Sequence, residues 1–169
     1  MIGKKDVNKY EETNFVDTTK PVWNYSLLTD DDVTNYQNGN NYQLYKKFGS
    51  HSIQVNEVWG MYFCVWAPNA TSVSVKGNFN DWKNHEFELN PRWDKSGIWE
   101  GFIPFMQKGE VYKYHIHGYK GSKQDKGDPF AWFWEKRPAT ASITWALDFE
   151  WNDTAWMKKR KQHNSLDAP

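Results

Sequence analysis

W-G-M-Y-F-C-V-W-A-P-N-A-T-S-V-S-V-K-G-N-F-N-D-W, residues 59–82, carries the strongest structural signal in this chain. Met61, Phe63 and Val65 recur at every second position of its first half, and Val73 and Val75 do so in its second half. A period of two is that of a β-strand with one buried face. Because a Pro-Asn turn signal at 68–69 separates the two runs, the stretch predicts strands over residues 59–67 and 72–79.

Further strand patterns follow on both sides of clear turn signals. Tyr112, Tyr114 and Ile116 share one face of a run in which Lys113 and His115 point the other way. Gly, Asn, Asp and Pro separate the runs at spacings typical of an antiparallel sandwich. We therefore predict an all-β antiparallel β-sandwich, with additional strands over residues 86–90, 98–105, 111–119 and near 142–147.

The flanks of this region predict short helices. Thr29 fits an N-cap, three aspartates at 30–32 occupy the first turn, Leu28 and Val33 fit a hydrophobic staple, and Asn-Gly at 38–39 supplies the stop. The acidic run is alternatively a set of metal ligands. We expect a tail and lead-in helix over residues 1–41, the sandwich over 42–150, and a linker over 151–169.

The linker is expected to hold a short helix capped at Asp153 or Thr154. Basic residues at 158–161 fall in its last turns, where cations favour the helix dipole. The same run resembles a nuclear-import or nucleic-acid patch, and this reading is the weaker alternative because the rest of the chain supplies no basic field.

Composition excludes several classes of protein. The 169 residues carry 21 Lys and Arg against 21 Asp and Glu, which argues against a nucleic-acid or polybasic membrane binder. The chain has one cysteine, Cys64, and no apolar run long enough to cross a membrane. With no secretion signal visible, we expect a cytoplasmic protein.

No motif of the chain predicts catalysis or a cofactor. There is no Gly-x-Ser-x-Gly elbow and no phosphate-binding glycine loop, and Cys64 lies inside a predicted strand. Of the five histidines, His115 and His117 form the one close pair, and no third ligand stands at usable spacing. We therefore predict no catalytic residue, no metal site and no cofactor within this chain.

Aromatic residues make up 18% of the chain and suggest a binding surface. A flat indole covers the apolar face of a sugar ring, while amide and ammonium groups bond its hydroxyls. Trp82 is the best platform because it follows a turn, with Asn80 beside it and Lys113 on an outward strand face. The alternatives are an indole that caps the sandwich edge and a solvated lysine. Trp59, Trp66 and Trp99 fit the core or an interdomain contact better.

Several motifs in order resemble the amino-terminal domain of glycogen (1,4-α-glucan) branching enzymes. Residues 63–70 (FCVWAPNA), 73–82 (VSVKGNFNDW), 96–104 (SGIWEGFIP), 109–114 (GEVYKY), 128–131 (DPFA) and 137–142 (RPATAS) carry the likeness. The likeness covers most of the chain, from about residue 26 to Pro169. Each motif alone is weak, whereas their order and spacing together are specific.

The resemblance implies an immunoglobulin-like (early-set) sandwich, a carbohydrate-binding module of family 48. In such enzymes the module precedes a (β/α)8 barrel that cuts α-1,4 glucan and rejoins it through α-1,6 bonds. The barrel's catalytic Asp and Glu would lie beyond Pro169, so the chain is expected to be a piece without its own catalysis. Its implied partners are an α-glucan, such as glycogen or a maltooligosaccharide, and that barrel, but no nucleic acid and no membrane.

The resemblance carries the sugar-binding residues over only in part. Trp82 and Lys113 match positions that touch sugar in glucan-sensing members of the family. Tyr119 stands near the place of an expected second Trp as a weak substitute, and residues 140–144 offer no clear match for an expected Asn.

The leading hypothesis is a glucan-binding module of a branching enzyme. A structural interdomain module without its own sugar affinity, a stand-alone glucan-sensing regulatory subunit, and a module of a debranching enzyme are the alternatives.

Overall fold

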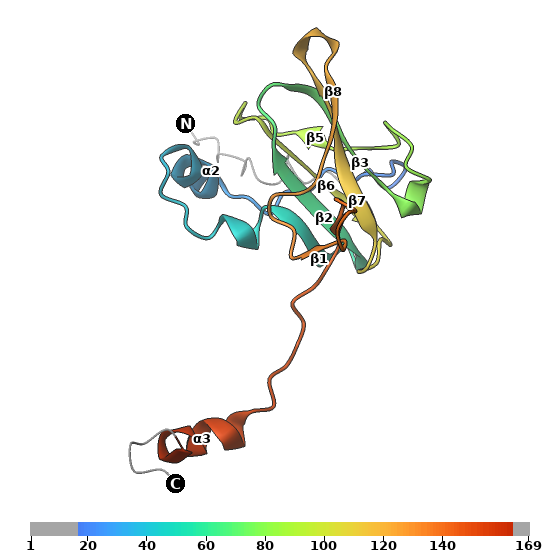
Figure 1. The fold of residues 1–169 in the computed structure, drawn as a ribbon. Helices are drawn as coiled ribbons and strands as arrows, with labels where there is room; N and C mark the ends of the chain where they lie inside the picture. The colour runs from blue at the N-terminus through green and yellow to red at the C-terminus, as the bar shows by residue number, and fades with distance from the viewer. Residues whose placement is uncertain (1–16, 164–169) are drawn as a thin grey trace, which may run out of the picture.

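The computed structural model describes the backbone of residues 17–163 and the side chains of residues 17–160. Two antiparallel sheets face each other, with a helix beside them and a second helix at the end of a long extended segment (Figure 1). This arrangement confirms the predicted all-β, immunoglobulin-like antiparallel sandwich with short flanking helices.

The first sheet has four strands in the order β1-β2-β6-β5. The second has the order β4-β3-β7-β10-β9, and β8 also pairs with β7. Every pairing is antiparallel. The strands span β1 Gly49–Val55, β2 Val58–Trp66, β3 Ala70–Gly77, β4 Phe87–Glu88, β5 Asn90–Pro91, β6 Ile98–Pro104, β7 Val111–Gly118, β8 Lys123–Lys126, β9 Phe133–Trp134 and β10 Ser142–Ile143. Short 3-10 turns lie at η1 Leu44–Lys46, η2 Asn78–Asn80 and η3 Tyr119–Gly121.

The core between the sheets follows the alternation of the sequence. Met61, Phe63, Val73 and Val75 are fully buried there, as the period of two predicts. Tyr112 and Tyr114 of β7 pack their rings edge-on against Phe63, with centroids 5.1 and 6.4 Å away. Because the hydroxyls of both tyrosines bond the buried Asp128, at 2.6 and 3.1 Å, the polar ends of these rings are satisfied inside the protein.

The predicted strand over residues 86–90 is wrong as a single element. The chain pairs with β3 through β4, passes the buried Leu89, and then pairs with β6 in the other sheet through β5. The residue between the two short strands serves as the corner at which the chain changes sheets.

The structure differs from the prediction at two further strands. The strand near 142–147 is confined to β10, and β1 was not predicted. Of the three tryptophans expected in the core or at an interdomain contact, Trp99 is buried in the core. Trp59 and Trp66 are 62% and 51% exposed, so for them the interdomain contact stays the prediction.

The outer face of the first sheet is covered by the lead-in segment and helix α2 (Asp30–Gln37). Thr29 caps α2 in a capping box with Asp32, and both residues of the expected staple, Leu28 and Val33, are buried. Upstream, Trp23 forms a β-bridge with Phe102 of β6. The predicted helix is therefore confirmed, and it lies against Tyr62, Cys64 and Phe102 on the sheet.

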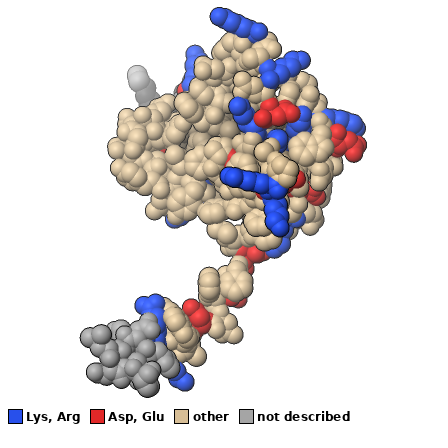
Figure 2. Space-filling model, in the orientation of Figure 1, with Lys and Arg blue, Asp and Glu red and all other residues tan. Residues whose placement is uncertain are grey.

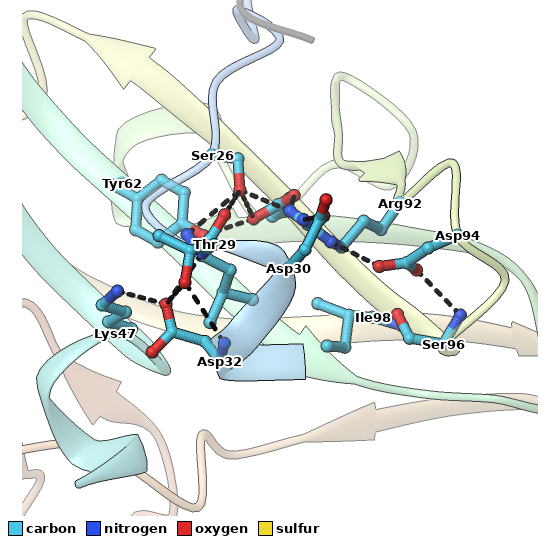
Figure 3. Close-up of polar contacts among 12 residues, drawn as sticks. Ser26, Thr29, Asp30, Asp32, Lys47, Tyr62, Arg92, Asp94, Ser96 and Ile98 are labelled. Atoms are coloured by element: carbon cyan, nitrogen blue, oxygen red, sulfur yellow. Dashed lines mark hydrogen bonds and ion pairs between the residues drawn. The ribbon is translucent and has the colours of Figure 1, made fainter. Parts of the chain in front are cut away.

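A buried ionic network ties the lead-in to the sheet (Figure 3). The Arg92 guanidinium bonds Glu100 at 3.0 Å, Asp94 at 2.7 Å and the Ser26 hydroxyl at 2.6 Å. Glu100 also accepts bonds from Ser26 at 2.9 Å and from the Tyr62 hydroxyl at 2.5 Å. Desolvation raises the pKa of Glu100 above its ordinary value and outweighs these stabilising bonds.

Beyond β10 the chain leaves the sandwich in an extended segment and ends in helix α3 (Thr154–His163), which confirms the expected terminal helix (Figure 1). Among the described residues, no helix is both long and apolar enough to cross a membrane.

Candidate functional site

The loop between β3 and β4 presents Trp82 at one edge of the second sheet. The Trp82 amide bonds the Gly77 carbonyl at 2.9 Å, and its indole Nε1 bonds Asn78 Oδ1 at 2.9 Å. Both contacts fix the ring, which is still 36% exposed. An anchored, accessible indole is the arrangement that stacking on a sugar ring requires, because little side-chain entropy is lost on binding.

Asn80 has a different position from the one expected of a sugar contact. It is buried, its Oδ1 accepts from the Gly77 amide at 3.0 Å, and its Nδ2 donates to the Lys83 carbonyl at 3.0 Å. The expectation that Asn80 faces the sugar is therefore corrected, because both ends of its amide close the turn that carries Trp82.

Lys113 lies at the same end of the sheet as Trp82. Gly77, which bonds Trp82, pairs with Tyr112, the neighbour of Lys113 in β7. The Lys113 ammonium donates to the Thr140 hydroxyl at 2.8 Å and is partly exposed. Ammonium and hydroxyl groups in this position are the kind that bond sugar hydroxyls.

Tyr119 is 64% exposed but lies at the opposite end of β7, after Gly118. From Tyr112 to Gly118 a strand rises about 20 Å. Tyr119 is therefore too far away to share one sugar ring with Trp82, and the structure does not bring it into this site.

Two residues that the sequence did not nominate, Thr140 and Trp134, lie near one another, and Thr140 adjoins Lys113. The Thr140 hydroxyl accepts a hydrogen bond from the Lys113 ammonium. The Thr140 carbonyl and the Trp134 ring both lie within 3.5 Å of the position that a Cβ on Gly127 would take, so these two residues lie close together. Trp134 is 45% exposed. The family-like run at 137–142 contained Thr140, but the contact depends on β10 pairing with β7 and has no local sequence signal.

The outer face of the sheet next to Lys113 is polar and mixed in charge. Lys76, directly opposite Lys113, bonds Asn84 at 3.0 Å and Asp125 at 2.8 Å. Partial burial raises the pKa of Asp125, but bonds from Lys76 and His115 outweigh it and lower that pKa below its ordinary value. Figure 2 likewise shows blue and red side chains interspersed on the visible face.

His115 and His117 follow Lys113 on the same face of β7, and His85 from the loop joins them. Partial desolvation, together with neighbouring His85, His115 and Lys123, lowers the pKa of His117. No third ligand stands at usable spacing in the sequence, yet the fold brings His85 to the pair through the pairing of β3 with β4 and β7.

A second surface is apolar. Exposed aromatic and aliphatic side chains line a groove of about 600 Å³ beside β1 and β2. Trp59, Tyr45 and Leu147 are 62%, 44% and 69% exposed within it. The remaining lining residues include Leu27, Lys46, His51, Ser52, Ile53, Trp132, Trp145, Ala146 and Asp148.

Comparison with known proteins places the chain in a family. The sequence profile of carbohydrate-binding module 48 (isoamylase N-terminal domain) matches residues 47–131, half of the chain. The chain belongs to this family. The match spans β1 to β8 and includes Trp82, Lys113 and all three clustered histidines.

Curated relatives of this family 48 module confirm the resemblance to branching enzymes. The chain is 44% identical over 146 residues to 1,4-alpha-glucan branching enzyme GlgB of Desulfitobacterium hafniense, covering 85% of the chain and 23% of that enzyme. Against GlgB of Albidiferax ferrireducens the identity is 46% over 144 residues, covering 85% and 23%. The chain thus spans about a fifth of the length of the curated relatives it matches.

Solved structures similar to the chain include two pullulanases. The Klebsiella pneumoniae pullulanase complexed with maltotriose is 25% identical, with a TM-score of 0.46, covering 64% of the chain and 10% of that protein. The pullulanase from Bacillus acidopullulyticus is 20% identical, with a TM-score of 0.46, covering 57% and 11%.

Proposed function

We propose that this chain is the glucan-binding and scaffolding module of a 1,4-α-glucan branching enzyme. The single observation that carries the proposal is an anchored, exposed Trp82 at the same end of the sheet as Lys113 in a family 48 module. The longer protein would transfer α-1,4 glucan segments to α-1,6 branch points in glycogen synthesis, in the cytoplasm. Its catalytic carboxylates would lie outside this chain.

The mode of binding follows from the chemistry of the surface. The Trp82 indole removes the apolar face of one glucose unit from water, while the Lys113 ammonium and the Thr140 hydroxyl bond its hydroxyl groups. One stacking ring and two or three hydrogen bonds support a dissociation constant of roughly 0.1–1 mM for a short maltooligosaccharide. A long glucan that offers many equivalent sites is expected to be retained more strongly.

Native electrophoresis in gels with and without glycogen tests this proposal. We expect glycogen to retard the chain, Trp82→Ala to abolish the retardation, and Lys113→Ala to weaken it. Trp151→Ala is the matched control, since Trp151 is 77% exposed in the extended segment away from the sandwich. Equal retardation of the Trp82 and Trp151 variants would refute Trp82 as the platform, and a wild-type chain that migrates freely would refute autonomous glucan binding.

A structural role is the second candidate, and the apolar groove favours it. Several exposed aromatic side chains gathered in one groove are typical of a surface that is covered by a partner. We propose that the partner is the catalytic domain of the same enzyme. The test joins this chain to the catalytic part of the D. hafniense relative and compares hydrogen exchange with that of the isolated chain. Protection of the backbone at residues 51–53, 59 and 145–147 supports the proposal, and unchanged exchange there would refute it.

A further inference from the structure

Three histidines converge on the outer face of the second sheet. His115 and His117 lie two residues apart on β7 and therefore project from the same face. His85 comes from the loop before β4. Their nearest ring nitrogens all lie within 4.8 Å of one another, and the ring centroids are 4.5 to 5.6 Å apart.

Two carboxylates orient the imidazoles from behind. Asp125 Oδ1 lies 2.6 Å from His115 Nδ1, and Glu88 Oε1 lies 2.9 Å from His85 Nδ1. A carboxylate on Nδ1 favours the tautomer that keeps its proton there and leaves the Nε2 lone pair free for a ligand. The carboxylate–histidine pairs of metal sites have this arrangement, and here two of the three histidines possess it.

The inward nitrogens are already close to the spacing of a tetrahedral site. His115 Nε2 and His117 Nε2 are 3.0 Å apart. With zinc–nitrogen bonds of about 2.0–2.1 Å, two ligands of a tetrahedral ion lie roughly 3.3 Å apart. The Nε2 atoms of His115 and His117 therefore need to move apart by a few tenths of an ångström to bind the ion. His85, whose side chain is 44% exposed in a loop, has room to move toward the ion as its third ligand.

We propose that His85, His115 and His117 form a binding site for a divalent transition-metal ion such as Zn²⁺. A set of three imidazoles suits zinc, copper or nickel and discriminates against Mg²⁺ and Ca²⁺, which take oxygen ligands. Three protein ligands leave a fourth position for water or an outside donor. The bound ion would cross-link the loop that carries Trp82 to β7, and binding of the ion itself requires no glucan.

Without a metal, a hydrogen bond between His117 and His115 accounts for the short distance between their Nε2 atoms. The two accounts differ in what they predict for added metal. A hydrogen-bonded pair has no need of His85, whereas a metal site loses one of its ligands when His85 is removed.

Calorimetric titration of the chelator-treated chain with Zn²⁺ tests the proposal, with Co²⁺ absorption as a second readout. We expect one ion per chain, micromolar or tighter binding, and the visible bands of four-coordinate Co²⁺. His85→Ala and His117→Ala should each weaken binding at least tenfold, and Asp125→Asn by roughly 10–100-fold, as for other groups behind metal ligands. Zn²⁺ should also raise the Tm of the wild type, because it binds the native state.

His163→Ala is the matched control, because it also removes a histidine side chain but at the end of α3, and this variant should bind Zn²⁺ like the wild type. Circular dichroism verifies that each variant folds, and His85→Ala remains interpretable because it changes an exposed loop residue. Binding that survives both His85→Ala and His117→Ala would overturn the proposal. So would the absence of saturable binding or Co²⁺ bands at millimolar metal.

Discussion

Replacement of Arg92 by methionine tests the network that joins the lead-in segment to the sheet. Its side chain is 2% exposed and that of its partner Glu100 is 5% exposed. Arg92→Met keeps most of the volume but leaves the Glu100 carboxylate buried without its cation. Removing one partner of a buried ion pair costs about 3–5 kcal/mol. For a chain of this size that loss corresponds to a fall in Tm of roughly 6–20 °C.

The loss of stability caused by Arg92→Met should depend on pH in a definite direction. The pKa of Glu100 is already raised in the folded state, so its contribution to stability is fully present below the unfolded pKa and is lost as pH rises through the folded pKa. Arg92→Met raises the folded pKa further. The destabilisation should therefore be smaller at pH 5 than at pH 7.

Urea unfolding followed by tryptophan fluorescence and circular dichroism measures both effects. The double variant Arg92→Met/Glu100→Gln removes the stranded charge and keeps the bonds from Tyr62 and Ser26 to the remaining side-chain oxygen, so it should recover much of the loss. A loss below about 1 kcal/mol for Arg92→Met, the size of an exposed ion pair, would refute the reasoning. A double variant no more stable than Arg92→Met would also refute it.

Thr29→Ala should lower the free energy of unfolding by about 0.5–2 kcal/mol, because it removes the capping box of α2. An unchanged urea midpoint would contradict this. Gly77→Ala should displace the Trp82 loop and abolish glycogen retardation, because the new Cβ would lie 1.9 Å from the Val111 carbonyl oxygen. Native electrophoresis measures the retardation, and a variant that glycogen still retards would contradict the role of the loop. Desolvation raises the pKa of Asp128, so the stability advantage of the wild type over Asp128→Asn should shrink between pH 4 and pH 7. Urea titrations at both values test this, and a growing advantage would be the contrary result.

Local patterns account for the parts of the fold that could be predicted. The cap at Thr29, the staple of Leu28 and Val33, and the alternation of Met61 and Phe63 are each written within a few neighbouring residues. The corner at Leu89 could not be predicted in this way, because its two neighbours pair with strands of different sheets.

The residues of the candidate sites likewise differ in whether a local sequence signal identifies them. Trp82 follows a recognisable turn, and Lys113 lies on the polar side of an alternating strand, so both could be nominated from sequence. Thr140 and His85 could not, because each reaches the site only through long-range strand pairing. The burial of Asn80 could not be predicted either, because sequence does not show which polar side chain a turn uses for its own closure.

The cover that α2 and the lead-in place over the first sheet makes the cooperative unit of this protein longer than its family profile. The family profile begins at residue 47, yet Trp23, Leu28 and Val33 lie before it and shield Phe102 and Tyr62. A recombinant fragment trimmed to the boundaries of the family profile would present a bare hydrophobic sheet face to water. Boundaries for expression, domain exchange or crystallisation are therefore better drawn upstream of Val22, the first of the described residues to join the core, than at the edge of the family profile.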